Sequence, residues 1–169
     1  MKQSALLLAA SLLTLQAAAQ DASGTIAATL DGAERVWTVL PEDAGGQSWW
    51  TATGPVIGVG LWAAPEGSAG PIEDVLDLTL SAVQQGGTTV LAGSELRLLT
   101  SDLTVYYHAT EDDLMLEITD LEAGEAGLSV SGSFSGRLAR TTFSDGAEVA
   151  DPDDTREIEG TFEAFLPAE

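Results

Sequence analysis

Carboxylates are the most abundant groups in this chain that could do chemistry. The 169 residues include 27 Asp and Glu, 6 Lys and Arg, one histidine and no cysteine, with a formal net charge of -21. Glycoside hydrolysis uses paired carboxylates, but one of them must have its pKa raised in an apolar cleft. The acidic residues cluster in turns and on the polar sides of strand-like segments. We therefore expect solvated charge and no catalytic residue.

One acidic segment offers the oxygen ligands that calcium prefers. Asp151, Asp153 and Asp154 follow one another closely in a stretch that resembles a loop, and hard cations bind carboxylate oxygens. Their spacing does not match the EF-hand pattern. Calcium at these three aspartates is thus the single cofactor considered. The absence of cysteine and the lone histidine exclude thiolate and three-histidine metal sites.

His108 is the single imidazole that could act as a base. A Ser-His-Asp arrangement would place it beside an activated serine, yet no G-x-S-x-G elbow precedes a helix. His108 shares the polar side of a strand-like segment with Tyr106. We expect it to lie on the solvent face.

The tryptophans form the stronger candidate binding site. Trp49, Trp50 and Trp62 are close in sequence, and two adjacent residues of a strand point to opposite faces of the sheet. Gly58 and Gly60 would form a flat shelf for a neighbouring ring. A partly exposed aromatic patch of this kind can bind a sugar ring, a lipid or a partner protein, although core packing also explains it.

Strands must position these residues, because apolar and polar residues alternate with period two and helical periodicity is absent. Asp31-Gly32 is a strong hairpin signal. A short helical turn is expected at 71–75. The predicted strands cover 24–30, 33–40, 47–52, 56–63, 75–83, 88–92, 96–100, 103–109 and 114–121. Together with two later strands, this pattern predicts an all-β antiparallel sandwich or small closed barrel of roughly 8–11 short strands.

A repeated motif predicts the pairing of the last two strands. The segments 130–138 and 158–166 both read [V/I]-x-G-x-F-x-[G/A]-x-L. Antiparallel pairing would place Gly132 opposite Phe162 and Phe134 opposite Gly160, so that each ring covers a bare glycine. The connection 144–155 is then expected to be a long acidic hairpin loop.

The N-terminus has the features of a secretory signal peptide. Lys2 precedes an apolar run over 5–15, and Ala17-Ala18-Ala19 offers a cleavage site after Ala19. The run is shorter than the roughly 20 residues that span a bilayer. We expect a single β domain over 20–169, located in the periplasm of a Gram-negative bacterium or secreted from it.

The two ends of the predicted mature chain resemble secreted bacterial β-rich proteins of uncharacterised function. The resemblance consists of the first strand with its Asp31-Gly32 turn, the following Trp37, and the late G-x-F strands. It implies an exported antiparallel β domain and assigns no catalytic residues.

These features predict a class of function without a named ligand. A surface this acidic repels nucleic acid and anionic membrane surfaces and favours a monomer. The leading hypothesis is a non-enzymatic binding or envelope-associated module with a protein or small-molecule partner. The alternative is a barrel-type carrier of a lipid or other apolar molecule, and a hydrolase is the third hypothesis.

Overall fold

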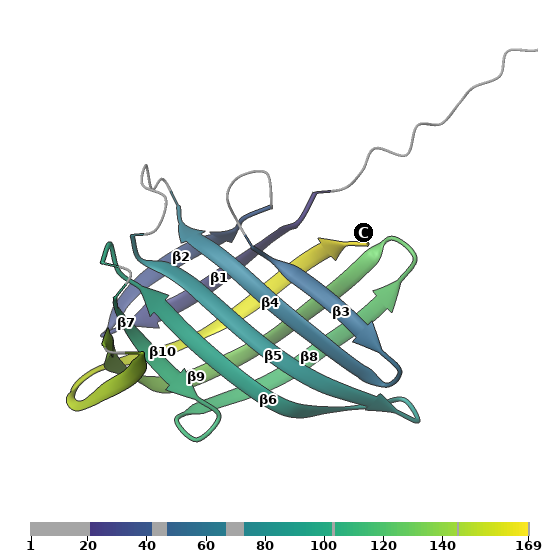
Figure 1. Ribbon diagram of the computed structural model, residues 1–169. Helices are drawn as coiled ribbons and strands as arrows, with labels where there is room; N and C mark the ends of the chain where they lie inside the picture. The colour runs from purple at the N-terminus through teal and green to yellow at the C-terminus, as the bar shows by residue number, and fades with distance from the viewer. Residues whose placement is uncertain (1–20, 42–46, 67–72, 103, 145, 169) are drawn as a thin grey trace, which may run out of the picture.

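Ten antiparallel strands make up the fold, and the described residues contain no helix (Figure 1). The computed structural model describes residues 21–41, 47–66, 73–102, 104–144 and 146–168. The predicted signal peptide lies outside them, as do Pro71 and Leu103. The strands are β1 (Ser23–Leu30), β2 (Ala33–Val39), β3 (Trp49–Thr53), β4 (Val56–Pro65), β5 (Val75–Gln85), β6 (Thr88–Leu99), β7 (Val105–Thr110), β8 (Leu114–Gly124), β9 (Gly127–Ser144) and β10 (Ala147–Pro167).

The hydrogen bonds between strands form a closed ring. They run in the order β1-β2-β4-β5-β6-β7-β9-β10, and β10 pairs back to β1. β3 extends the line of β2 along β4, and β8 extends the line of β7 along β9. The ring therefore has eight strand positions, and the predicted all-β antiparallel fold is confirmed. A ring of this size is just wide enough for side chains to fill its interior.

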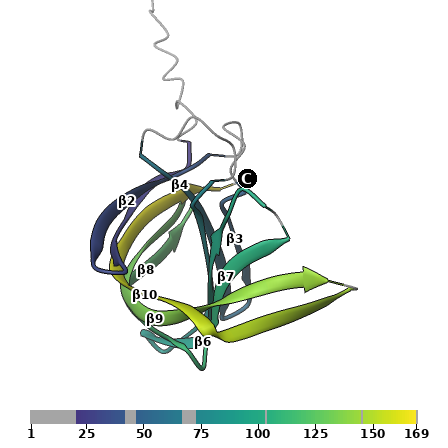
Figure 2. The same ribbon diagram turned by 90° about the vertical axis from the view of Figure 1, so that its left-hand side faces the viewer.

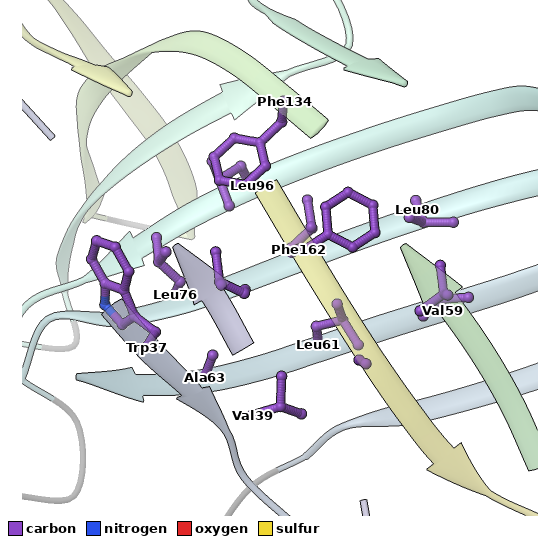
Figure 3. Close-up of a cluster of buried hydrophobic side chains, with 14 of the residues drawn as sticks. Trp37, Val39, Val59, Leu61, Ala63, Leu76, Leu80, Leu96, Phe134 and Phe162 are labelled. Atoms are coloured by element: carbon purple, nitrogen blue, oxygen red, sulfur yellow. The ribbon is translucent and has the colours of Figure 1, made fainter. Parts of the chain in front are cut away.

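Apolar side chains occupy that interior. On β5, Leu76, Leu78 and Leu80 are buried inside, whereas Asp77 and Thr79 alternate with them on the outside. Figure 3 shows side chains from opposite strands meeting in the same cluster. The inward-facing set includes Trp37, Val59, Leu61, Leu96, Phe134 and Phe162.

The predicted register of the last two strands is confirmed. β9 and β10 pair with Gly132 opposite Phe162 and with Phe134 opposite Gly160. The two phenylalanine rings have their centroids 6.4 Å apart and are both buried. The Phe162 ring fills space that a side chain on Gly132 would need, whereas Ala27 and Ala28 of β1 fill that space at Gly160. Both glycines thus help to lock the register of the strand that closes the ring.

The expected hairpin loop at 144–155 is wrong. The strands remain paired as far as Ala147 opposite Ser144, with Asp151 opposite Arg140, and the hairpin projects from the body of the molecule (Figure 2). The register shifts between Asp151 and Thr155. An acidic sequence can still pair as a strand when its side chains point into solvent, because the ladder uses only backbone groups.

The expected break around residues 93 and 94 is also wrong, since β6 is one continuous strand. Ser81 lies opposite Gly93 and Ala82 opposite Leu91, which leaves Ala92 as the extra residue of a β-bulge. A helical turn is expected at 71–75. The structure instead places Glu73 and Asp74 in a turn directly before β5. Asp74 has a φ of 57°, a left-handed conformation that ends such a turn rather than continuing a helix.

We predict that Gly132→Ala destabilises the fold. A Cβ at this position would lie 2.6 Å from the Phe162 ring and closer still to the Glu117 carbonyl oxygen, so the strands must move apart. The free energy of unfolding in urea should fall by about 1–3 kcal/mol, as is usual for overpacking. Gly124→Ala is the control, because its Cβ would meet nothing nearer than 4.0 Å. Equal effects of the two substitutions would contradict the proposed locking of the register.

Candidate functional site

Trp49 and Trp50 point to opposite faces of β3. The Trp49 indole lies on the outside above Gly58 and Gly60, where a Cβ on Gly58 would be 3.2 Å from the ring, and it remains 44% exposed. Trp50 packs against the core, and its Nε1 donates a hydrogen bond of 2.8 Å to the Pro167 carbonyl. The glycine shelf predicted from the sequence therefore carries Trp49, while Trp50 joins β3 to the end of β10.

Trp62 belongs to the same outer face as Trp49 and begins a row of polar neighbours. Cross-strand register places Trp62 beside Asp77, Asp77 beside Arg97, and Arg97 beside His108. We call these four residues the polar row. The Trp62 Nε1, Arg97 Nε and His108 Nε2 atoms are buried, and none has a hydrogen-bond partner. Such atoms are uncommon in native proteins, because each carries a desolvation cost.

A groove lies beside the polar row on the outer face of β4, β5 and β6, the face turned toward the viewer in Figure 1. Trp49 forms one wall, and the turn after β7, with Glu111 and Asp112, forms the other. Short side chains between the walls leave a hollow of about 450 Å³. Its lining residues are Trp49, Gly58, Thr79, Leu80, Ser81, Gly93, Ser94, Glu95, Thr110, Glu111 and Asp112.

Glu95 connects the groove to the polar row. Its Oε1 lies 2.5 Å from a terminal nitrogen of Arg97 and 3.3 Å from Nε2 of His108, without hydrogen-bond geometry to the imidazole. His108 is on the outer face, as predicted, but its side chain is only 13% exposed. The face is the predicted one, but at this position it is covered and not open to solvent. The surrounding side chains, including Tyr106 with its ring 6.1 Å away, cover the imidazole.

Burial changes the ionisation of two groups here. The pKa of Asp77 is raised, mainly because burial disfavours its charged form, while nearby Arg97 opposes the shift. Burial, together with Glu148 on the β9–β10 hairpin, raises the pKa of Tyr106 to about 12. The Arg97 guanidinium lies 5.8 Å from the centre of the Tyr106 ring. This part of the outer face is thus drier than an ordinary sheet surface.

The three aspartates considered for calcium do not face a common point. Asp151 accepts a hydrogen bond from the backbone N–H of Asp153. Asp154 accepts one from the Tyr107 hydroxyl and lies 3.7 Å from Arg140. Within the described ranges, no three Asp, Glu, His or Cys residues are grouped so that they could hold a metal ion.

Sequence reasoning found Trp49, Trp62 and the glycine shelf but missed Glu95, Asp77 and Arg97 as their neighbours. These residues look like ordinary outward positions of separate strands. Their proximity follows from the register of β4, β5 and β6, and the bulge at Ala92 changes that register partway along β6. The alternation of apolar and polar residues in β5 indicates which face each side chain occupies. It does not indicate which residues of β4 and β6 lie beside it.

Comparison of this chain with protein-family models, curated proteins and solved structures finds no match. The functional argument therefore rests on the site itself.

We predict that Asp77→Asn stabilises the protein at pH 7. Because the folded-state pKa of Asp77 is raised, the wild type loses stability as the pH rises through that pKa, and the amide avoids this loss. The melting temperature of the variant should exceed that of the wild type at pH 7, and the gain should shrink near pH 4. Asp153→Asn, an equal charge change at an exposed site, should alter stability by less than about 0.5 kcal/mol. A lower melting temperature for Asp77→Asn at pH 7 would show that attraction to Arg97 outweighs burial.

Proposed function

We propose that this chain is an exported, non-enzymatic binding module whose ligand site is the outer groove beside Trp49. The position of the Trp49 indole is the observation that supports this proposal most directly. It lies on two glycines and remains 44% exposed at the wall of a hollow. Ligand sites combine such aromatic surface with a few polar groups that fix orientation, and here the outward hydroxyl groups of Thr79 and Ser81 are available.

The filled interior supports binding on the outside over carriage of an apolar molecule inside. Leu61, Leu78, Leu96 and Phe162 come from different strands and are each no more than 2% exposed. Interiors packed in this way leave few voids larger than a water molecule. A lipid would have to displace these side chains, whereas the groove is open to solvent.

The surroundings of His108 support binding over hydrolysis. Nucleophilic catalysis needs a hydrogen bond between the base and a nucleophile. In the part of the chain that the structure describes, Nε2 of His108 has no hydrogen-bond partner, and the group 3.3 Å from it is a carboxylate oxygen of Glu95 and not a hydroxyl.

Export is the second part of the proposal, and it rests on the N-terminal sequence. Within the described ranges, no helix has the length and apolar character needed to cross a membrane.

We predict that ligand binding requires Trp49. The ¹⁵N-labelled protein is titrated with choline chloride, methyl β-glucoside and sodium acetate, which represent cationic, neutral and anionic ligands. At least one of them should shift the amide signals of β4–β6 and the Trp49 indole N–H. Trp49→Ala should raise the Kd at least tenfold, and Gly93→Val should do the same by filling the floor. A Cβ at Gly93 would lie 3.4 Å from the Ser81 hydroxyl, an ordinary van der Waals distance, so the strand can accept a side chain there.

Phe143→Ala is the matched control, because it removes an aromatic ring of similar exposure, 51%, from the projecting hairpin. This variant should bind like the wild type. The absence of any saturable shift, or shifts confined to surfaces away from the groove, would overturn the proposed site.

Export is tested on the full chain expressed in a Gram-negative host. We expect the osmotic-shock fraction to contain a protein that begins at Gln20, as determined from its intact mass. Ala19→Leu should leave most of the protein uncleaved, since the cleavage site needs small residues. Uncleaved wild-type protein retained inside the cell would contradict the prediction.

A further inference from the structure

The charge of the groove narrows the class of ligand, and this inference rests on the proposed function. Three of the lining residues are carboxylates, Glu95, Glu111 and Asp112. Glu95 pairs with Arg97, whereas among the described residues Glu111 and Asp112 form no ion pair. The lining contains no Lys or Arg. An anionic ligand would therefore be repelled, all the more because the whole chain has a formal net charge of -21.

We infer that the ligand is a small organic ammonium ion, such as a quaternary or alkyl amine. Trp49 supplies an exposed indole to one side of the hollow, and an ammonium group within about 6 Å of a tryptophan ring is attracted by the ring's quadrupole. Glu111 stands on the opposite wall, where its Oε2 would be 3.7 Å from a Cβ on Gly93. A cation in the groove thus lies between an aromatic ring and a carboxylate.

A bare metal ion fits this groove less well than an organic cation. Calcium needs about six to eight oxygen ligands at 2.3–2.6 Å. The carboxylates here come from β6 and from the turn after β7, and within the described ranges they do not form a cluster that could hold a metal. A hollow of about 450 Å³ suits a molecule of several heavy atoms. The methyl or methylene groups of such a ligand would contact the indole while its charge faces the carboxylates.

A neutral sugar would stack on Trp49 but would leave the carboxylates without a counter-charge. Carboxylates that lose water on binding need an opposite charge or several hydrogen-bond donors in return. An ammonium ion supplies that charge directly. Affinity for it should also fall as salt screens the carboxylates, which are open to solvent.

The experiment compares choline chloride with methyl β-glucoside by NMR titration of the full protein at 50 mM and 500 mM NaCl. We expect choline to bind with at least a tenfold lower Kd than the glucoside at 50 mM NaCl. Its Kd should rise at least threefold at 500 mM NaCl. Glu111→Gln should raise the choline Kd about three- to tenfold. Glu159→Gln is the control, because it removes the same charge from an exposed position of β10 outside the groove lining, and it should change the Kd less than twofold.

The outcomes separate the two proposals. Binding of the glucoside in preference to choline, with loss in Trp49→Ala, overturns the ammonium ligand and leaves the groove as the binding site. Equal effects of Glu111→Gln and Glu159→Gln also overturn it, because choline would then be attracted only by the general negative charge. Binding of acetate alone at the groove also overturns the ammonium ligand, and no binding of choline, the glucoside or acetate there overturns both proposals.

Discussion

Closure of the sheet through β10 is the constraint on which the rest of this structure depends. β10 pairs with β9 along one edge and with β1 along the other, so the register of a single strand determines how the whole ring meets. That register depends on two large rings facing two glycines, Phe134 with Gly160 and Phe162 with Gly132. A slip of β10 by one residue would turn Phe162 out of the core. In a chain without cysteine, strand pairing and core packing supply this closure without a disulfide.

Closure of the sheet also separates the apolar residues inside the ring from the polar residues outside it. The interior of this eight-position ring is filled mainly by apolar side chains of suitable size. Polar and ionisable residues are consequently displaced to the outer face. There the register gathers Asp77, Glu95, Arg97 and His108 from three strands. The covered outer surface around them raises the pKa of Asp77 and of Tyr106. The candidate site is thus a consequence of the way the core is built.

The shape of the groove depends mainly on outward positions that hold glycine or a short side chain. Gly58 and Gly60 allow Trp49 to lie flat against β4, and Gly93 with Ser81 leaves the floor low. Larger residues at these outward positions would be compatible with a strand but would fill the hollow. The small residues give up packing contacts at these positions. A ligand in the groove, as proposed, would supply contacts in their place.

The sequence by itself determined the class of fold, the inward residues of β5 and the pairing of β9 with β10. Period-two alternation and the repeated G-x-F motif are local signals, and they specify which face of a strand is apolar and which register hides a glycine. The continuation of β9 and β10 through the acidic segment 144–155 could not be predicted, since backbone pairing does not depend on apolar side chains. The burial of His108 and its approach to Glu95 were decided only by the tertiary structure. Contacts across three strands depend on every intervening register and on the bulge at Ala92, and no local pattern contains that information.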